Sequence, residues 1–282
     1  DSAEWADSDN DGIGDNADTD NSTKGRAYLM TTSAGANLTT LHIINSSSGP
    51  QSFTGTLYNR DGEQMGASNL PLHNGTVASQ GRLRLASADL EELFEIEPWA
   101  GPAMLEVNGT TSFNLMSKLQ SPSGLISNTN CVRQDMVHNL EGFDSDNLTY
   151  VRLINIGDTA LTDIRGTVTD SDGSTVGTAD VQLVAELPAK SAVFINRNDL
   201  ADKIGAEWNG TASLSTTLPR PNLRLLNLNF VNDETFFNFS CYESNDSGRV
   251  YLFTNAASAN VSETHYINTS SSTNTLTANL YA

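Results

Sequence analysis

The stretch DSDNDGIGDNAD, which begins at Asp7, carries carboxylates at short regular intervals with hardly a hydrophobic residue among them. Aspartates at the first, third and fifth positions can converge on one centre when the backbone curls, and Gly12 at the sixth position permits the sharp turn. A backbone carbonyl at the seventh position and aspartates at the ninth and twelfth would complete the shell. Oxygen ligands without His or Cys favour Ca²⁺. The predicted ligands are Asp7, Asp9, Asp11, Ile13 (carbonyl), Asp15 and Asp18, with Asp20 beginning a neighbouring site.

This loop differs from an EF-hand in two respects, because the twelfth residue is Asp18 rather than Glu and no helical pattern flanks it. DSDNDGIGDNADTD resembles instead the thrombospondin type 3 repeat, whose units read DxDxDGxGDxxD, over residues 1–22. The resemblance implies Ca²⁺ held by aspartates on a chain with almost no core of its own. The alternative is an acidic, disordered linker. Without metal the carboxylates should repel one another, so we interpret the segment as a spacer that calcium stiffens.

The composition narrows the class of partner. The 282-residue chain has a net charge of −19, which disfavours nucleic acid and anionic membranes as partners. Its apolar runs are far shorter than the ~20 residues that span a bilayer. Abundant Asn, Ser, Thr and Gly with scarce Lys is typical of secreted all-β proteins. The predicted location is therefore extracellular, secreted or at the cell surface.

The remainder of the chain is an internal repeat. GRAYLMTTSAGANLTTLHIIN from Gly25 aligns without a gap with GRVYLFTNAASANVSETHYIN from Gly248. A more diverged copy starts near Tyr150 and matches the segment from Thr40. The predicted divisions are a calcium-binding segment at 1–23, repeats at 24–134 and 135–246, and an incomplete third repeat at 247–282.

Each repeat of about 110 residues reads mostly as strands. Period-two alternation in SFTGTLYN places Phe53, Gly55 and Leu57 on one face, and a small residue between two large ones indicates a bulky neighbour. TLTANLYA, with Leu276, Ala278 and Leu280 on one face, is the third copy of this strand. Asp61–Gly62 and Asp172–Gly173 mark hairpin turns.

One short helix is predicted in each repeat. Ser87 is predicted to cap a helix over 88–94, and Asn198 one over 199–204 that ends at Gly205. With about seven strands a repeat, the predicted fold is all-β: tandem Ig-like antiparallel β-sandwiches, preceded by an irregular calcium-binding segment. A small Greek-key barrel is the alternative.

The repeats over residues 24–282 resemble units of the form INxGxxxxxxxGTxxDxDGxxxG…ADLExxxG…WxGxAxLxV in large secreted proteins of marine and environmental bacteria. Such units occur beside thrombospondin type 3 repeats and are sometimes attached to hydrolases. The resemblance implies an extracellular location and modularity, and it implies no particular chemistry.

The histidines and cysteines form no pattern typical of a catalytic or zinc site. His42 and His265 occupy equivalent positions, at which the second repeat has Arg152. His73 and His138 lack a matched nucleophile and base pattern. The cysteines, Cys131 and Cys241, lack zinc-ligand spacing. They are either an inter-repeat disulfide or two separate small core residues, and the second interpretation is preferred.

Two sets of repeated residues have a structural and a binding interpretation. Trp99 and Trp208 are predicted to be core residues, with sugar stacking as the alternative. Asn45, Asn155 and Asn268 each end an apolar run and are predicted to be buried amides that satisfy loop backbone, with a ligand-binding amide as the alternative.

The sequence therefore predicts a non-enzymatic, calcium-binding modular segment that acts as spacer, adhesin or fibre-forming subunit. The contrasting hypothesis is a carbohydrate-binding accessory region of a secreted hydrolase. The third repeat stops in its second recognisable strand at Ala282. Either the chain is part of a longer modular protein, which is preferred, or another chain completes this repeat by strand addition. Candidate partners are calcium, copies of the chain or neighbouring modules, and surface glycans.

Overall fold

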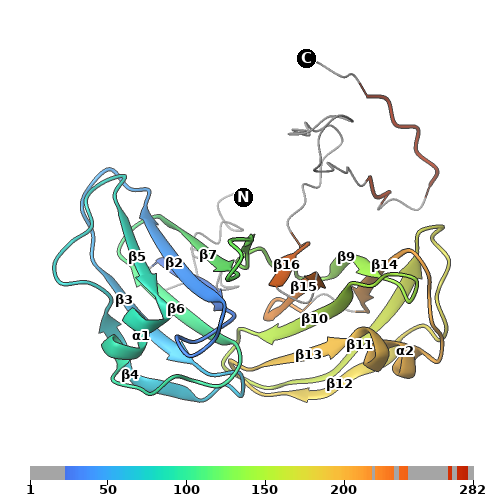
Figure 1. The fold of residues 1–282 in the computed structure, drawn as a ribbon, viewed down its shortest axis with the longest axis horizontal. Coiled ribbons are helices and arrows are strands. Elements are labelled where there is room, and N and C mark those ends of the chain that lie inside the picture. The colour runs from blue at the N-terminus through green and yellow to red at the C-terminus, as the bar shows by residue number, and fades with distance from the viewer. Residues whose placement is uncertain (1–22, 218–219, 232–234, 241–265, 269–271, 279–282) are drawn as a thin grey trace, which may run out of the picture. The chain divides into compact units, whose positions relative to one another are not determined.

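The computed structural model describes residues 23–217, 220–231, 235–240, 266–268 and 272–278 (Figure 1). The chain divides into two compact units, Asp1–Cys241 and Tyr242–Ala282. The first unit contains every helix and strand of the described residues. The predicted ligands between Asp7 and Asp20 lie outside the described residues.

Eight strands and one helix form the first repeat. They are β1 (Thr23–Leu29), β2 (Leu38–Asn45), β3 (Phe53–Tyr58), β4 (Gln64–Pro71), β5 (Arg82–Ala86), α1 (Ser87–Phe94), β6 (Ala103–Gly109), β7 (Phe113–Gln120) and β8 (Ile126–Asn128). They build two antiparallel sheets with the orders β1-β6-β3-β4 and β5-β2-β7-β8. Leu41, Ile43, Phe53 and Leu57 lie in the core of this repeat.

The second repeat has the same elements in the same order. They are β9 (Met136–Glu141), β10 (Leu148–Asn155), β11 (Leu161–Asp170), β12 (Val181–Leu187), β13 (Ala192–Asn196), α2 (Arg197–Ile204), β14 (Thr211–Thr216), β15 (Leu223–Val231) and β16 (Thr235–Asn238). The sheet orders β12-β11-β14-β9 and β13-β10-β15-β16 reproduce those of the first repeat strand for strand. The two repeats therefore share one topology.

The all-β prediction is confirmed, and each repeat has a β-sandwich-like architecture. Each contains eight strands rather than about seven. The order also differs from that of an immunoglobulin domain, whose first two strands are neighbours in one sheet. Here β1 and β2 belong to different sheets.

The close approach predicted at Gly55 is confirmed, and the equivalent Gly166 of the second repeat has a similar neighbour. A Cβ added at Gly55 would lie 2.8 Å from Leu72 Cδ2, and one at Gly166 would lie 2.8 Å from Leu183 Cδ1. The turn glycines have left-handed backbone, with φ of 85° at Gly62 and 84° at Gly173.

The predicted helix caps are wrong by one or two residues. The α2 helix begins at Arg197, and its cap is Asn196, whose side chain accepts a hydrogen bond from Asp199 N at 2.9 Å. The α1 helix begins at Ser87, whose Oγ donates instead to the carbonyl of Thr31 at 2.7 Å. Gly205 ends α2 as predicted, with φ 73°.

The described residues of the second unit contain no helix or strand. The strand predicted in TLTANLYA is therefore not formed over 275–278, and the Leu276 side chain is exposed. Asn268 Nδ2 donates to Ser272 O at 2.7 Å, and Asn274 Nδ2 donates to Asn268 Oδ1 at 2.9 Å.

Candidate functional site

The described residues contain no candidate metal site. They contain no group of three or more His, Cys, Asp or Glu side chains that could hold a metal ion. The predicted ligands Asp7, Asp9, Asp11, Ile13, Asp15, Asp18 and Asp20 lie outside them. The described helices are also too short or too polar to cross a membrane.

The two repeated tryptophans are core residues, as predicted. Trp99 is 7% exposed and Trp208 is 4% exposed. Trp208 Nε1 donates to Leu140 O at 3.2 Å, and its ring meets Phe143 edge-on. Neither ring face is free for stacking on a sugar.

The asparagine prediction is confirmed in both sandwiches. Asn45 Nδ2 donates to Gly49 O, Val77 O and Ala78 O at 2.8, 2.9 and 3.1 Å. Asn155 Nδ2 donates to Thr159 O, Leu187 O and Pro188 O at 2.8, 3.1 and 2.9 Å. Each amide connects two loops of its own repeat. The prediction of a buried amide is wrong for Asn268, which is exposed, although its Nδ2 donates to Ser272 O as Asn45 Nδ2 does to Gly49 O.

One serine and histidine pair was missed by the sequence analysis. His138 Nδ1 lies 2.7 Å from Ser213 Oγ, and burial lowers the pKa of the imidazole. The two residues are 75 positions apart in the sequence, so no local pattern predicts that they pair. Ser213 on β14 is equivalent to Met104 on β6, because β14 pairs with β9 as β6 pairs with β1. Met104 faces away from the core of its own repeat. The His138–Ser213 pair therefore lies on the outward face of its sheet.

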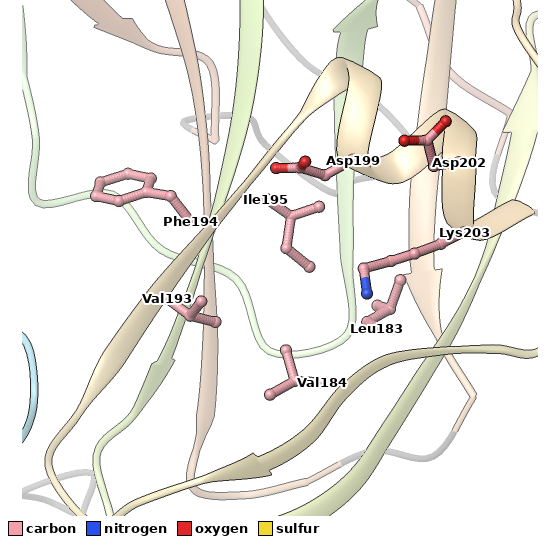
Figure 2. Close-up of a pocket in the computed structure, with 8 residues that line it drawn as sticks. All are labelled: Leu183, Val184, Val193, Phe194, Ile195, Asp199, Asp202 and Lys203. Atoms are coloured by element: carbon pink, nitrogen blue, oxygen red, sulfur yellow. The ribbon is translucent and has the colours of Figure 1, made fainter.

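A pocket of about 500 Å³ lies between β12, β13 and α2 (Figure 2). Its lining residues are Leu183, Val184, Val193, Phe194, Ile195, Asp199, Asp202 and Lys203. The aliphatic floor continues the core. Asp199 is the third helical residue of α2, and its side chain accepts from the backbone of the cap residue. That carboxylate therefore has a structural role.

The most extensive feature that the sequence analysis missed is a joint between the two sandwiches. A third apolar cluster combines residues of both repeats: Tyr28, Met30, Met104 and Leu119 from the first, and Ile154, Ile156, Leu226 and Leu228 from the second. All eight side chains are buried. The outward face of sheet β13-β10-β15-β16 thus packs on the first repeat.

Charged groups flank this apolar joint. Lys190 Nζ lies 2.8 Å from Glu106 Oε1, and Arg26 Nε lies 3.3 Å from the same oxygen. The three side chains are between 10% and 17% exposed. Arg60 O accepts a hydrogen bond from Ala192 N at 2.8 Å. The polar groups at the edge of the joint are therefore paired across it.

The tip of the first hairpin touches the second repeat directly. A Cβ added at Gly62 would lie 2.1 Å from Ala189 O, whereas nothing lies within 4 Å of one added at the equivalent Gly173. Only glycine fits at the joint position. The equivalent turn of the second repeat carries no such restriction.

Arg152 is buried in the joint without a carboxylate partner in the described residues. Its side chain is 1% exposed, Nη1 lies 4.0 Å from Met30 Sδ, and the guanidinium lies 5.9 Å from the Phe194 ring centroid. Burial lowers its pKa to about 10. The residue equivalent to His42 is thus a structural component of the joint.

Cys131 is disulfide-bonded, so the preferred interpretation of a separate core thiol is wrong for this residue. The other cysteine of the sequence, Cys241, lies outside the described residues. Cys131 O accepts a hydrogen bond from Asn238 Nδ2 at 2.8 Å. The segment that links the repeats is therefore held by β16.

No family model matches this chain, and no curated protein is similar to it in sequence.

Proposed function

We propose that this chain is a non-enzymatic structural element of a secreted or cell-surface protein, in which two β-sandwich repeats form a stiff spacer behind a calcium-binding segment. The observation that carries the proposal is the buried joint. Its apolar cluster, its paired charges and the glycine contact oppose bending between the repeats. A chain of freely rotating modules would need none of these contacts.

The disulfide of Cys131 supports the extracellular location, because disulfides persist in oxidising compartments. The net charge of −19 suits a calcium-rich exterior. The ligands proposed for Ca²⁺ are the aspartates between Asp7 and Asp18 with the carbonyl of Ile13, and Asp20 would serve a neighbouring site.

The stiffness is tested by one substitution with a matched control. Gly62→Ala forces a carbon against Ala189 O, whereas Gly173→Ala enters open space at nearly the same φ. Both variants carry similar backbone strain, about 1–2 kcal/mol, because alanine disfavours positive φ. Small-angle scattering of the full chain should show a larger radius of gyration and a broader distance distribution for Gly62→Ala alone. Equal profiles for both variants would remove the support for a stiff joint.

The calcium proposal is tested by titration calorimetry of the full chain after chelator treatment. We expect binding heat that is abolished in Asp9→Asn/Asp11→Asn. The control is Asp170→Asn/Asp172→Asn, which alters a similar DxDG turn whose Asp170 Oδ1 already accepts from Asp172 N and Ser174 N. Calcium heat that is unchanged in the first double variant would refute the assignment.

Self-association is tested separately by light scattering with calcium and with chelator. A constant monomer mass would leave the spacer proposal intact and exclude a fibre-forming role for this chain. Large species that need calcium would favour assembly.

A further inference from the structure

The outward face of sheet β5-β2-β7-β8 is positively charged on an otherwise acidic protein. Arg82, Arg84 and Lys118 project from it around His42, and we call these four residues the basic face. None of the four strands contains Asp or Glu. The whole chain has 34 acidic and 15 basic residues, so this local excess of cations is not the average composition.

His42 lies at the centre of the basic face. It pairs with Arg84 on β5 and with Met116 on β7, and its side chain is 6% exposed. The described residues offer its buried Nδ1 no hydrogen-bond partner. Burial lowers the pKa of the imidazole, and the charges of Arg82, Lys118 and Arg84 lower it further. The His42 imidazole therefore lies among cationic side chains, with no hydrogen-bond partner for Nδ1 in the part of the chain that the structure describes.

The second repeat shows what this position does. Arg152 pairs with Phe194 and Leu226 in the register in which His42 pairs with Arg84 and Met116. Apolar residues stand at the positions of the three cations: Ala192 for Arg82, Phe194 for Arg84 and Leu228 for Lys118. In the second repeat this face receives the module that precedes it in the chain, which is the first repeat.

The segment that precedes the first repeat has the opposite charge. Residues 1–22 contain no Lys or Arg and eight acidic residues: Asp1, Glu4, Asp7, Asp9, Asp11, Asp15, Asp18 and Asp20. We propose that the basic face is the docking surface for residues 1–22 of the same chain, so that the face equivalent to the joint binds the preceding module in both repeats. The inference does not depend on calcium binding.

The segment can reach this surface. A Cβ added at Gly25 on β1 would lie 2.7 Å from Leu115 Cδ1, so the first strand of the repeat faces β7, a strand of this sheet, across the interior of the sandwich. Twenty-two residues span roughly 70 Å when extended, whereas the sheets of a sandwich are only about 10 Å apart. Because Arg82 and Arg84 are exposed, the attraction should weaken as salt is added.

A zero-length carbodiimide cross-linker, which joins a carboxylate to an amine, tests the proposal on the full chain. Lys118 is the one amine on the four strands of the sheet. In chelator and low salt, peptide mass spectrometry should find Lys118 joined to carboxylates of residues 1–22. Lys203, which is exposed on α2, should not form these links. The Lys118 yield should fall several-fold in 0.5 M salt.

Two double variants give the decisive comparison. Arg82→Gln/Arg84→Gln should reduce the Lys118 cross-link at least threefold without altering the lysine itself. Arg165→Gln/Arg220→Gln, which removes two cations from the second repeat, should leave the yield unchanged. An equal yield in both variants would overturn the proposal.

Mixing ¹⁴N and ¹⁵N chains identifies the occupant. Cross-linked peptides of one isotope support docking within a chain, whereas mixed-isotope products would show that a second copy occupies the face and would refute the proposal as stated. Absence of any Lys118 link to residues 1–22 would also refute it. If calcium leaves the yield unchanged, the calcium proposal is weakened while the docking inference stands.

Discussion

At the scale of the residue, the unusual feature is a guanidinium in an apolar joint. Arg152 is the largest fully buried side chain among the described residues. Burial of a charge costs several kcal/mol unless it is well paired, and a sulfur atom and one aromatic ring are weak partners. The charge therefore opposes the stability of the joint that surrounds it.

We expect Arg152→Met to raise the free energy of unfolding by about 1–3 kcal/mol, because Met fills similar space without a buried charge. Urea denaturation of the full chain measures the change. Phe194→Leu serves as a control for altered packing and should lower stability. A loss of stability in Arg152→Met would show that the guanidinium holds the joint together.

His42 predicts a pH dependence of stability. Its pKa in the folded chain lies below the ordinary 6.5, chiefly because of burial. As the pH falls, the unfolded chain therefore binds a proton at His42 before the folded chain does. Protonation of His42 leaves the free energy of unfolding unchanged above about pH 6.5 and lowers it progressively at lower pH. His42→Gln should give a flatter dependence of unfolding free energy between pH 7 and 5 than the unchanged chain. His73→Gln, at an exposed position, should not.

At the scale of the element, the two helices differ in one cap. Asn196 and Ala86 have nearly the same backbone conformation, with φ and ψ of −83° and 172° and of −87° and 169°, but only Asn196 has a capping side chain. We expect Asn196→Ala to cost about 1 kcal/mol and Ala86→Asn to add about 0.5–1 kcal/mol. Thermal unfolding of the two variants checks the opposite signs. A destabilising Ala86→Asn would contradict the equivalence of the two sites.

Much of each repeat was predictable from local pattern. Alternation placed Phe53 and Leu57 in the core, and the glycine between them predicted the approach of Leu72. The helix starts were not predictable, because several polar residues stood within reach and the preceding strand continues directly into each helix. The end of the preceding strand fixes where each helix begins, and the sequence does not show that end. Ser87 and Asn198 are therefore plausible caps from the sequence alone.

The joint was harder to predict, because alternation shows which face a repeat buries internally and not what covers the other face. A signal was present in LRLLNLNF, where Leu226 and Leu228 add apolar residues to the outward positions of a strand. Strands buried on both faces read as continuous apolar runs. The basic face carried only a partial local signal, since Arg82 and Arg84 alternate with leucines on β5 whereas Lys118 and His42 come from two other strands.

At the scale of the whole molecule, one carboxylate joins cations of both repeats. Glu106→Gln should lower the free energy of unfolding by about 1–3 kcal/mol, because Arg26 would lose its ion-pair partner. Lys190 would lose the shared carboxylate but keep Asp158 and the Ile156 carbonyl. Chemical denaturation measures the loss. Asp163→Asn is the control, because its ion pair with Arg165 is exposed and its removal should have no measurable effect. A small effect in both variants would show that apolar packing alone secures the joint.

The equal register of the two sheets has a consequence for the order of the array. The backbones of the repeats are interchangeable, but their outward faces are not. If the second repeat were placed first, the face with Arg82, Arg84 and Lys118 would have to bury three cations in a dry contact, while Phe194, Leu226 and Leu228 would meet water. The outward face of this sheet therefore determines which module can precede each repeat. It fixes the order of the two repeats, although their strand topologies are the same.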